Sequence, residues 1–211
     1  MYLPDHFDLG PQEDVFNAID AAPFANLVTI TDQGPFSTPL PLYLDREEEP
    51  HGVLYGHIAR ANPQWKTAVH GTALAIFMGP DAYVSPSFYP TKQETGKVVP
   101  TWNYVTVQAR GPVEFFTDQD RLRDVVNKLT DLQETGRSSP WKVSDAPDRF
   151  VEVQLRGIVG VRLPIAQLFG KAKLSQNKAG TDYSGVVTGL SASADPKETQ
   201  VGRAMEKLSR N

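Results

Sequence analysis

The sequence contains no cysteine. Without thiols the chain can form neither a disulfide nor a thiolate metal site, and it has no cysteine nucleophile. Long hydrophobic runs are also missing. The longest wholly apolar run spans about six residues, from Ala73 to Met78, whereas a membrane-spanning helix needs about 20. We therefore expect a protein that does not cross a membrane.

A secretory signal and an excess of positive charge are absent as well. The N-terminal sequence MYLPDHFDLGPQEDVF is acidic and contains two prolines, where a signal needs a basic start and an apolar run. We therefore predict a cytoplasmic protein. The formal net charge is −4, and the sequence shows neither a helix-turn-helix pattern nor a basic arm. These features argue against direct binding of nucleic acid.

Several enzyme signatures are missing too. The sequence has no G-x-S-x-G elbow, no Walker loop, no H-E-x-x-H motif and no His/Asp spacing typical of a metal site. The four histidines are scattered along the chain. Hydrolase and metalloenzyme functions are therefore disfavoured, and we predict no metal site.

Short strands dominate the expected structure. Apolar runs and apolar/polar alternation predict strands over residues 24–31, 36–44, 52–58, 73–78, 83–85, 103–116 and 157–163. The first two strands are expected to form a hairpin. The sequence Gly79-Pro80-Asp81 predicts a turn between residues 73–78 and 83–85, and Gly111-Pro112 predicts a bulge or bend.

Helices are expected around this sheet. Helical spacing of apolar residues predicts them over residues 11–22, 117–136 and 195–208, and a first helical turn is expected after Asn62-Pro63. In the helix over 117–136, Thr117 is the expected cap, and the predicted buried face carries Leu122, Val125, Val126, Leu129 and Leu132. Residues 145–156 fit either a helix or a strand, and we favour the helix.

This pattern shows no β-α-β alternation. It predicts a mainly β (α+β) fold, a β-barrel with peripheral helices. We expect one barrel domain over residues 1–190 and a C-terminal helical tail over residues 191–211.

The first candidate site is the segment from Gly56 to Trp65, GHIARANPQW. Here a strand end delivers His57 and Arg60 to the start of a helix, where backbone N–H groups and a guanidinium can bind phosphate. The alternative is structural: Asn62 is then a plain helix cap and Arg60 a surface charge. The residues alone do not decide between the two.

The second candidate is VVPTWNY, which places Asn103 between Trp102 and Tyr104 at a strand start. A flat heteroaromatic ring can stack there while the amide bonds its polar edge. As an isolated motif, it is more simply explained by core aromatics in an alternating strand.

Two further segments stand out, GKAKLSQN late in the chain and PDAYVSPSFYP from Pro80 to Pro90. The first is basic and rich in amides, and the second is rich in aromatics, proline and serine. Taken separately, the first fits a solvated loop and the second a structured loop between strands.

Together these segments resemble the PaiB family, the FMN-binding negative transcriptional regulators. The resemblance runs through the segments MYLPDHF, GHIARANPQW, GPDAYVSPSFYP, VVPTWNY, PWKVSDAP and GKAKLSQN, over about the first 190 residues. It implies an FMN-binding split β-barrel with peripheral helices, related to pyridoxamine-phosphate-oxidase-like flavoproteins. It also implies a homodimer with the flavin held at the subunit interface.

The resemblance also implies roles for individual residues. His57, Arg60 and Asn62 would hold the flavin phosphate, and Trp65 would pack beneath them. Trp102, Asn103 and Tyr104 would approach the ring system, and Lys171, Lys173 and Gln176 would complete the pocket. A weak FMN-dependent oxidoreductase activity is one function that this resemblance allows.

Two other functions stay open. One is transcriptional regulation without bound flavin, which the absence of a DNA-binding motif makes indirect or dependent on a partner. The other is haem binding, because some split barrels handle haem, with His57 or His70 as the axial ligand.

Overall fold

The described residues form strands and helices, most of them at the positions that the sequence predicts. The structure is a computed structural model that describes residues 1–48, 50–68, 72–178 and 180–208. The strands are β1 (Phe24–Thr31), β2 (Gly34–Asp45), β3 (Val53–Ala59), β4 (Thr72–Val84), β5 (Thr101–Pro112), β6 (Glu114–Phe116), β7 (Ile158–Pro164) and β8 (Gln167–Lys173). The helices are α1 (Gln12–Ala21), α2 (Gln64–Thr67), α3 (Thr91–Thr95), α4 (Gln119–Glu134), α5 (Asp148–Leu155), α6 (Gly180–Ser191) and α7 (Pro196–Leu208), with 3-10 turns η1 (Asp5–Phe7), η2 (Pro86–Phe88) and η3 (Val143–Asp145).

The described strands form one sheet in the order β6-β7-β3-β2-β1-β4-β5-β8. The pairs β1–β2, β1–β4, β2–β3, β3–β7 and β6–β7 run antiparallel. By its internal contacts the chain divides into two units. Unit 1 contains residues 1–18, 78–107 and 169–211, and unit 2 contains residues 19–77 and 108–168.

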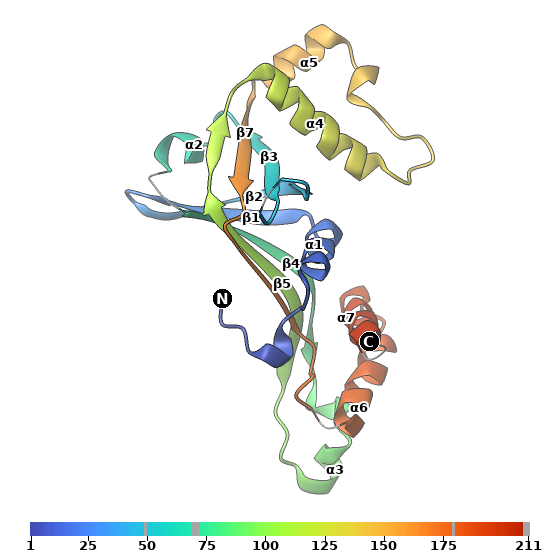
Figure 1. Cartoon of the computed structure of the whole chain (residues 1–211). Coiled ribbons are helices and arrows are strands. Elements are labelled where there is room, and N and C mark those ends of the chain that lie inside the picture. Colours follow the sequence, from blue (N-terminus) through green and yellow to red (C-terminus); the bar gives the residue numbers. More distant parts are fainter. Residues whose placement is uncertain (49, 69–71, 179, 209–211) are drawn as a thin grey trace. The chain divides into compact units, whose positions relative to one another are not determined.

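Unit 2 holds the predicted hairpin. Thr31 lies opposite Gly34 at its turn, and Gly34 has a φ of 107°, a left-handed value that glycine adopts without steric cost. Further along the sheet, Leu54 of β3 lies opposite Leu163 of β7, and both are fully buried. Helices α4 and α5, next to each other in Figure 1, pack on this part of the sheet.

Helix α4 is amphipathic, as the sequence predicts, but two details differ. Its cap is Asp118 rather than Thr117, because the Asp118 carboxylate accepts a hydrogen bond from the backbone N–H of Arg121 at 2.9 Å. Leu122, Val125 and Leu129 are buried as predicted, whereas Leu132 is 50% exposed. The buried face therefore ends one turn earlier than the apolar stripe in the sequence.

Unit 1 has its own hydrophobic core. Helices α6 and α7 pack against each other, and they bury Val186, Leu190, Val201 and Met205 against β4, β8 and the segment after β4. The packing of α6 against Phe88, in the segment after β4, needs small residues in the helix. A Cβ atom on Gly189 would lie 2.4 Å from the ring of Phe88. The helix predicted over 195–208 is thus confirmed as α7, and it is an integral part of unit 1.

One secondary-structure prediction is wrong, and some elements were not predicted. The predicted turn at Gly79-Pro80-Asp81 does not form, because β4 runs through it as a single strand. The alternation of burial shifts there by one residue: Ala75 and Phe77, in unit 2, are buried before it, and Ala82 and Val84, in unit 1, are buried after it. Strand β8 and helices α3 and α6 were not predicted from the sequence.

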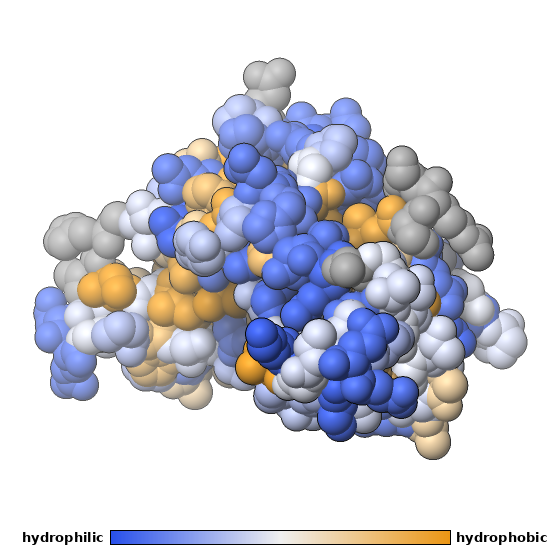
Figure 2. All heavy atoms as spheres, turned by 90° about the horizontal axis from the view of Figure 1, so that it is seen from below, coloured by the Kyte–Doolittle hydropathy of each residue, from blue (hydrophilic) through white to orange (hydrophobic). Residues whose placement is uncertain are grey.

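None of the helices in the described part of the chain combines the length and apolar character that a membrane span requires. Figure 2 nevertheless shows hydrophobic residues, in orange, that reach the surface at several places on the face it presents. The large exposed apolar side chains of unit 2 include Trp141 and Phe150, and those of unit 1 include Tyr83 and Trp102.

Candidate functional site

The predicted site residues fall into two groups, one in each unit. The unit 2 group contains His57, Arg60, Asn62 and Trp65, and the unit 1 group contains Trp102, Asn103, Tyr104, Lys171, Lys173 and Gln176. The unit 2 group follows the chain from the end of β3 to α2, as the sequence predicts.

Two members of the unit 2 group have clear structural roles. Asn62 Oδ1 accepts a hydrogen bond from the backbone N–H of Gln64, and its Nδ2 donates one to Thr38 Oγ1, each at 2.9 Å. Trp65 Nε1 donates to the carbonyl oxygen of Arg60 at 3.0 Å. Helix α2 is only four residues long, so its dipole is small. Any anion binding here would rest mainly on side chains.

The other two members, His57 and Arg60, each have a polar atom without a hydrogen-bond partner among the described residues. His57 Nδ1 and Arg60 Nε are buried and have no hydrogen-bond partner in the part of the chain that the structure describes. Arg60 makes one long hydrogen bond, from Nη2 to the carbonyl oxygen of Ile158 at 3.4 Å. Burial lowers the pKa of His57, so its imidazole is mainly neutral at pH 7. The residue at this site with an available positive charge is therefore Arg60.

His57 also lines a pocket of about 260 Å³ within unit 2. Trp141, Phe150 and Gln154 contribute to its wall, together with aliphatic side chains of α4, η3, α5 and β7. The described lining side chains include no Asp, Glu, Lys or Arg. Apart from His57, these wall residues were not among the predicted site residues, although Trp141 belongs to the segment PWKVSDAP that carries part of the resemblance.

Gln64 is another residue that the sequence analysis missed. It is fully buried, and its Nε2 donates to the Leu27 carbonyl oxygen at 3.1 Å and to Thr29 Oγ1 at 3.0 Å. These bonds attach α2 to β1 and so fix the position of the segment that carries Arg60. A buried glutamine has no signature in a single sequence.

In unit 1, two lysines flank an aromatic ring. The Nζ atoms of Lys171 and Lys173 lie 5.6 and 6.0 Å from the centre of the Tyr104 ring. Lys171 is buried and donates to the carbonyl oxygen of Tyr2 at 3.1 Å, while Lys173 donates to Thr101 Oγ1 at 2.6 Å. Burial, together with the charges of Lys171 and Lys178, lowers the pKa of Lys173.

Two predicted ligand contacts in unit 1 are occupied by internal hydrogen bonds. Asn103 is fully buried, its Oδ1 accepts from Ser175 Oγ at 3.1 Å, and its Nδ2 donates to Met205 Sδ at 3.5 Å. Gln176 accepts from the backbone N–H of Leu174 and donates to the carbonyl oxygen of Ala172, which closes the turn after β8. Both amides therefore stabilise unit 1 as they lie.

Trp102 is the accessible member of the group, because its side chain is 50% exposed. Its Nε1 donates to Asp81 Oδ1 at 2.9 Å, and its ring lies edge-on to Tyr83 at 6.0 Å. The second candidate haem ligand, His70, lies outside the described residues.

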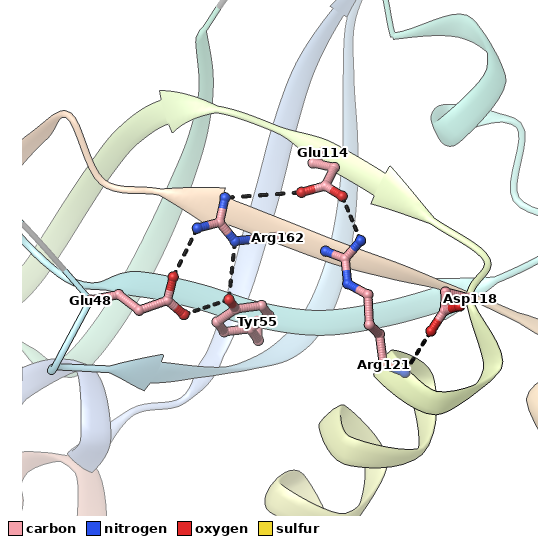
Figure 3. A network of polar contacts seen from close by, with 6 residues as sticks. All are labelled: Glu48, Tyr55, Glu114, Asp118, Arg121 and Arg162. Carbon is pink, nitrogen blue, oxygen red and sulfur yellow. Dashed lines mark hydrogen bonds and ion pairs between the residues drawn. The ribbon is translucent and has the colours of Figure 1, made fainter.

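A charged network in unit 2 connects β7 with β3, β6 and α4 (Figure 3). Arg162 donates to Glu48 at 2.8 Å and to the Tyr55 hydroxyl at 3.0 Å, and it lies 3.9 Å from Glu114. Arg121 donates to Glu114 at 2.8 Å. The Glu114 carboxylate therefore binds both β7 and the first turn of α4.

This network predicts an acid-sensitive contribution to stability. Partial burial opposes ionisation of Glu48, but hydrogen bonds from Tyr55 and Arg162 outweigh it and hold the pKa of Glu48 below its usual value. A hydrogen bond from Arg121 likewise lowers the pKa of Glu114. A lowered folded-state pKa stabilises the protein above the unfolded-state pKa of about 4.3, and this stabilisation is lost as the pH falls through the folded-state value.

We expect Arg162→Met to cost about 1 kcal/mol at pH 7, because the pairs are partly exposed. Urea unfolding at pH 7 and at several values below pH 4.3 measures the difference from the wild type. The difference should shrink as the pH falls. A difference that stays constant with pH would mean that Arg162 acts through packing alone.

Comparison with solved structures identifies the fold. The structure of the FAD and heme binding protein from Mycobacterium smegmatis matches with a TM-score of 0.58 and 17% identity, and covers 82% of this chain and 77% of that chain. The flavocytochrome Anf3 from Azotobacter vinelandii matches with a TM-score of 0.54 and 19% identity, over 82% of this chain and 73% of that chain. These likenesses concern the fold alone, and they confirm the mainly β split barrel with peripheral helices.

Comparison of sequences identifies the family. Residues 1–167 match the family model described as "Putative FMN-binding domain". The Bacillus subtilis (strain 168) protein named "Protease synthase and sporulation protein PAI 2", which is PaiB, shares 33% identity over 208 residues, 98% of this chain and 97% of that protein. With a family match over most of its length and a full-length relative, the chain belongs to the PaiB family of FMN-binding-domain proteins.

Proposed function

We propose that this protein binds FMN and that Arg60 holds the FMN phosphate. The observation that carries the proposal is the unsatisfied guanidinium of Arg60, which makes one long hydrogen bond and has no described partner at Nε. An arginine can direct two parallel hydrogen bonds to a phosphate. The residues at the end of β3 therefore fit the phosphate of a flavin nucleotide.

The other predicted contacts support this proposal unequally. His57 is mainly neutral and lines an apolar pocket, so its contact with phosphate stays a prediction. Trp102, Tyr104 and Lys173 offer an aromatic face and a cation that suit a flavin ring. We propose these three as ring contacts. Asn103, Lys171 and Gln176 would act by positioning them.

We also propose a homodimer with the flavin at the subunit interface, which the family resemblance implies. Trp102 and Tyr83 of unit 1 are exposed aromatic residues in contact with each other, and such a pair is typical of an interface. Bound FMN would supply the one- and two-electron redox chemistry, while the protein supplies its position and electrostatic surroundings. A role in transcription would act through a partner, since the net charge of −4 disfavours a DNA-binding surface.

The test is a titration of Arg60→Ala with FMN, FAD and riboflavin, followed by absorbance near ~450 nm, where flavins absorb. Loss of a charged hydrogen bond costs about 1.5–3 kcal/mol. This corresponds to an affinity for FMN that is about 10- to 150-fold lower. Affinity for riboflavin, which lacks the phosphate, should hardly change. Sedimentation of the same samples reports whether the protein is a dimer.

The matched control is Arg203→Ala, which removes an exposed arginine of α7 in unit 1. It should bind FMN as the wild type does. If Arg60→Ala lost equal affinity for FMN and for riboflavin, Arg60 would not bind the phosphate. A parallel haemin titration that gives a Soret band, with no flavin bound, would favour haem instead.

A further inference from the structure

The pocket beside His57 has a composition that the proposed FMN site does not explain. Its wall is mostly aliphatic and aromatic, with Trp141 and Phe150 together in it although each is about half exposed to solvent, at 47% and 56%. Arg60 is not among the lining residues. The pocket therefore lacks the group that we assign to phosphate.

Its polar groups are few. Among the described lining residues only His57 and Gln154 have a side chain that acts as both hydrogen-bond donor and acceptor, and Gln154 is exposed. His57 Nδ1 is buried without a partner. The His57 ring forms part of the pocket wall, and a hydrogen bond to a neutral imidazole contributes about 1 kcal/mol, so a ligand group that bonds the ring from the pocket gains about that energy.

The volume sets the size of the ligand. An apolar cavity of about 150 Å³ is large enough for benzene. A pocket of about 260 Å³ can therefore take one or two fused rings. It is smaller than the typical range of about 300–1,000 Å³ for drug-sized ligands, and too small for a whole flavin nucleotide.

The uncharged lining of the pocket excludes charged ligands. The described lining carries no acidic or basic side chain apart from His57, which burial keeps neutral. An anion or cation entering this pocket would lose its hydration without gaining a counter-charge. A neutral ligand pays no such cost, and an aromatic ligand gains contacts with Trp141 and Phe150.

We propose that this pocket is a separate binding site for a neutral, planar aromatic molecule of one or two rings that carries one hydrogen-bonding group, and that His57 is the partner of that group. Trp141 and Phe150 contact the faces or edges of the rings. The proposal goes beyond FMN binding, and it uses residues of unit 2 only.

The experiment uses paired probes that differ in one group: indole against indene, and phenol against toluene and benzoate. Calorimetry or protein-observed NMR measures binding to the full-length chain. Phenol and indole should bind more tightly than toluene and indene by about 5-fold, the equivalent of one hydrogen bond of about 1 kcal/mol. Benzoate should not bind measurably.

Two variants test the residues. His57→Phe keeps an aromatic ring but removes the polar nitrogens, so it should abolish the advantage of phenol over toluene. Ala146→Phe fills the pocket from the segment after η3 and should remove binding of every probe. Val153→Ala on α5, a residue that is 49% exposed and outside the lining, is the matched control and should bind as the wild type does.

FMN titration of the same variants separates the two proposals. Ala146→Phe should retain FMN affinity, and Arg60→Ala should retain phenol affinity. If Ala146→Phe does not fold, His57→Phe still tests the proposal. Equal binding of benzoate and phenol, or an unchanged preference for phenol in His57→Phe, would overturn it.

Discussion

Replacing Gly111 by alanine should destabilise the protein by more than about 3 kcal/mol. A Cβ atom at this position would lie 1.7 Å from the carbonyl oxygen of Pro164 and 2.9 Å from its carbonyl carbon. Both are backbone atoms, so no rotation of a side chain can relieve the clash. Gly111 is buried near the end of β5, where the backbone of β7 approaches closely.

The backbone of residues 164–166 cannot easily move away from Gly111. Pro164 pairs with Val53 of β3, and the next residue, Ile165, donates its N–H to the carbonyl oxygen of Gly52 at 3.0 Å. The N–H of Ala166 donates to the carbonyl oxygen of Arg110 at 2.8 Å. Making room for one methyl group would therefore break ladder hydrogen bonds on both sides.

Denaturant unfolding of Gly111→Ala measures this loss. The matched control is Gly180→Ala at the start of α6, where an added Cβ meets no atom within 4 Å. The control should be neutral or slightly stabilising, since alanine is the better helix former by up to about 1 kcal/mol. If both variants unfold at the same denaturant concentration as the wild type, the close approach of β5 and β7 is wrong.

Leu122→Ala should cost about 2–5 kcal/mol, the usual range for removing a fully buried leucine. Leu122 is 0% exposed and belongs to the core cluster between α4, α5 and the sheet of unit 2. Truncation would leave a cavity that the sheet and the helices can fill only in part. The loss should appear as a lower midpoint of denaturant unfolding.

Leu132→Ala is the control within the same helix. Leu132 continues the apolar stripe of α4 in the sequence, but it is 50% exposed. Its truncation should therefore change the free energy of unfolding by less than about 0.5 kcal/mol. Similar losses for the two variants would mean that α4 packs along its whole length, as the sequence pattern alone indicates.

The sequence predicts an element correctly where its local pattern fits only one kind of secondary structure. Strand β1 has the predicted bounds, 24–31, because apolar residues end at a turn with glycine. Residues 148–155 form α5, and the apparent alternation of Val151, Val153 and Leu155 is explained by a helix with Val153 at the surface. Helical and strand periods overlap over such short stretches, so only the tertiary context decides.

The missed elements depend on partners far away in the sequence. Helix α6 contains Ser184, Gly185 and Gly189, which have low helix propensity. These glycines are required because Phe88 and its backbone lie against the helix. A single sequence shows the cost of the glycine but not the packing that compensates for it.

The same limit applies to the site. The sequence marks Arg60 and His57 as candidate site residues because a strand end meets a helix start, which is a local pattern. The Asn103 amide, by contrast, is hydrogen-bonded to Ser175 and Met205, which are 72 and 102 residues away in the sequence. A local pattern cannot show that the amide already has these partners. The family model ends at residue 167, before Lys171 and Lys173, so the assignment of those two lysines rests on the resemblance alone.

The shift of burial within β4 restricts how the length of this chain can change. Phe77 faces the core of unit 2, and Ala82 faces the core of unit 1, with four residues between them. Inserting or deleting one residue in that stretch would reverse the faces of the strand on one side of it. Related sequences should therefore rarely differ in the number of residues between Phe77 and Ala82.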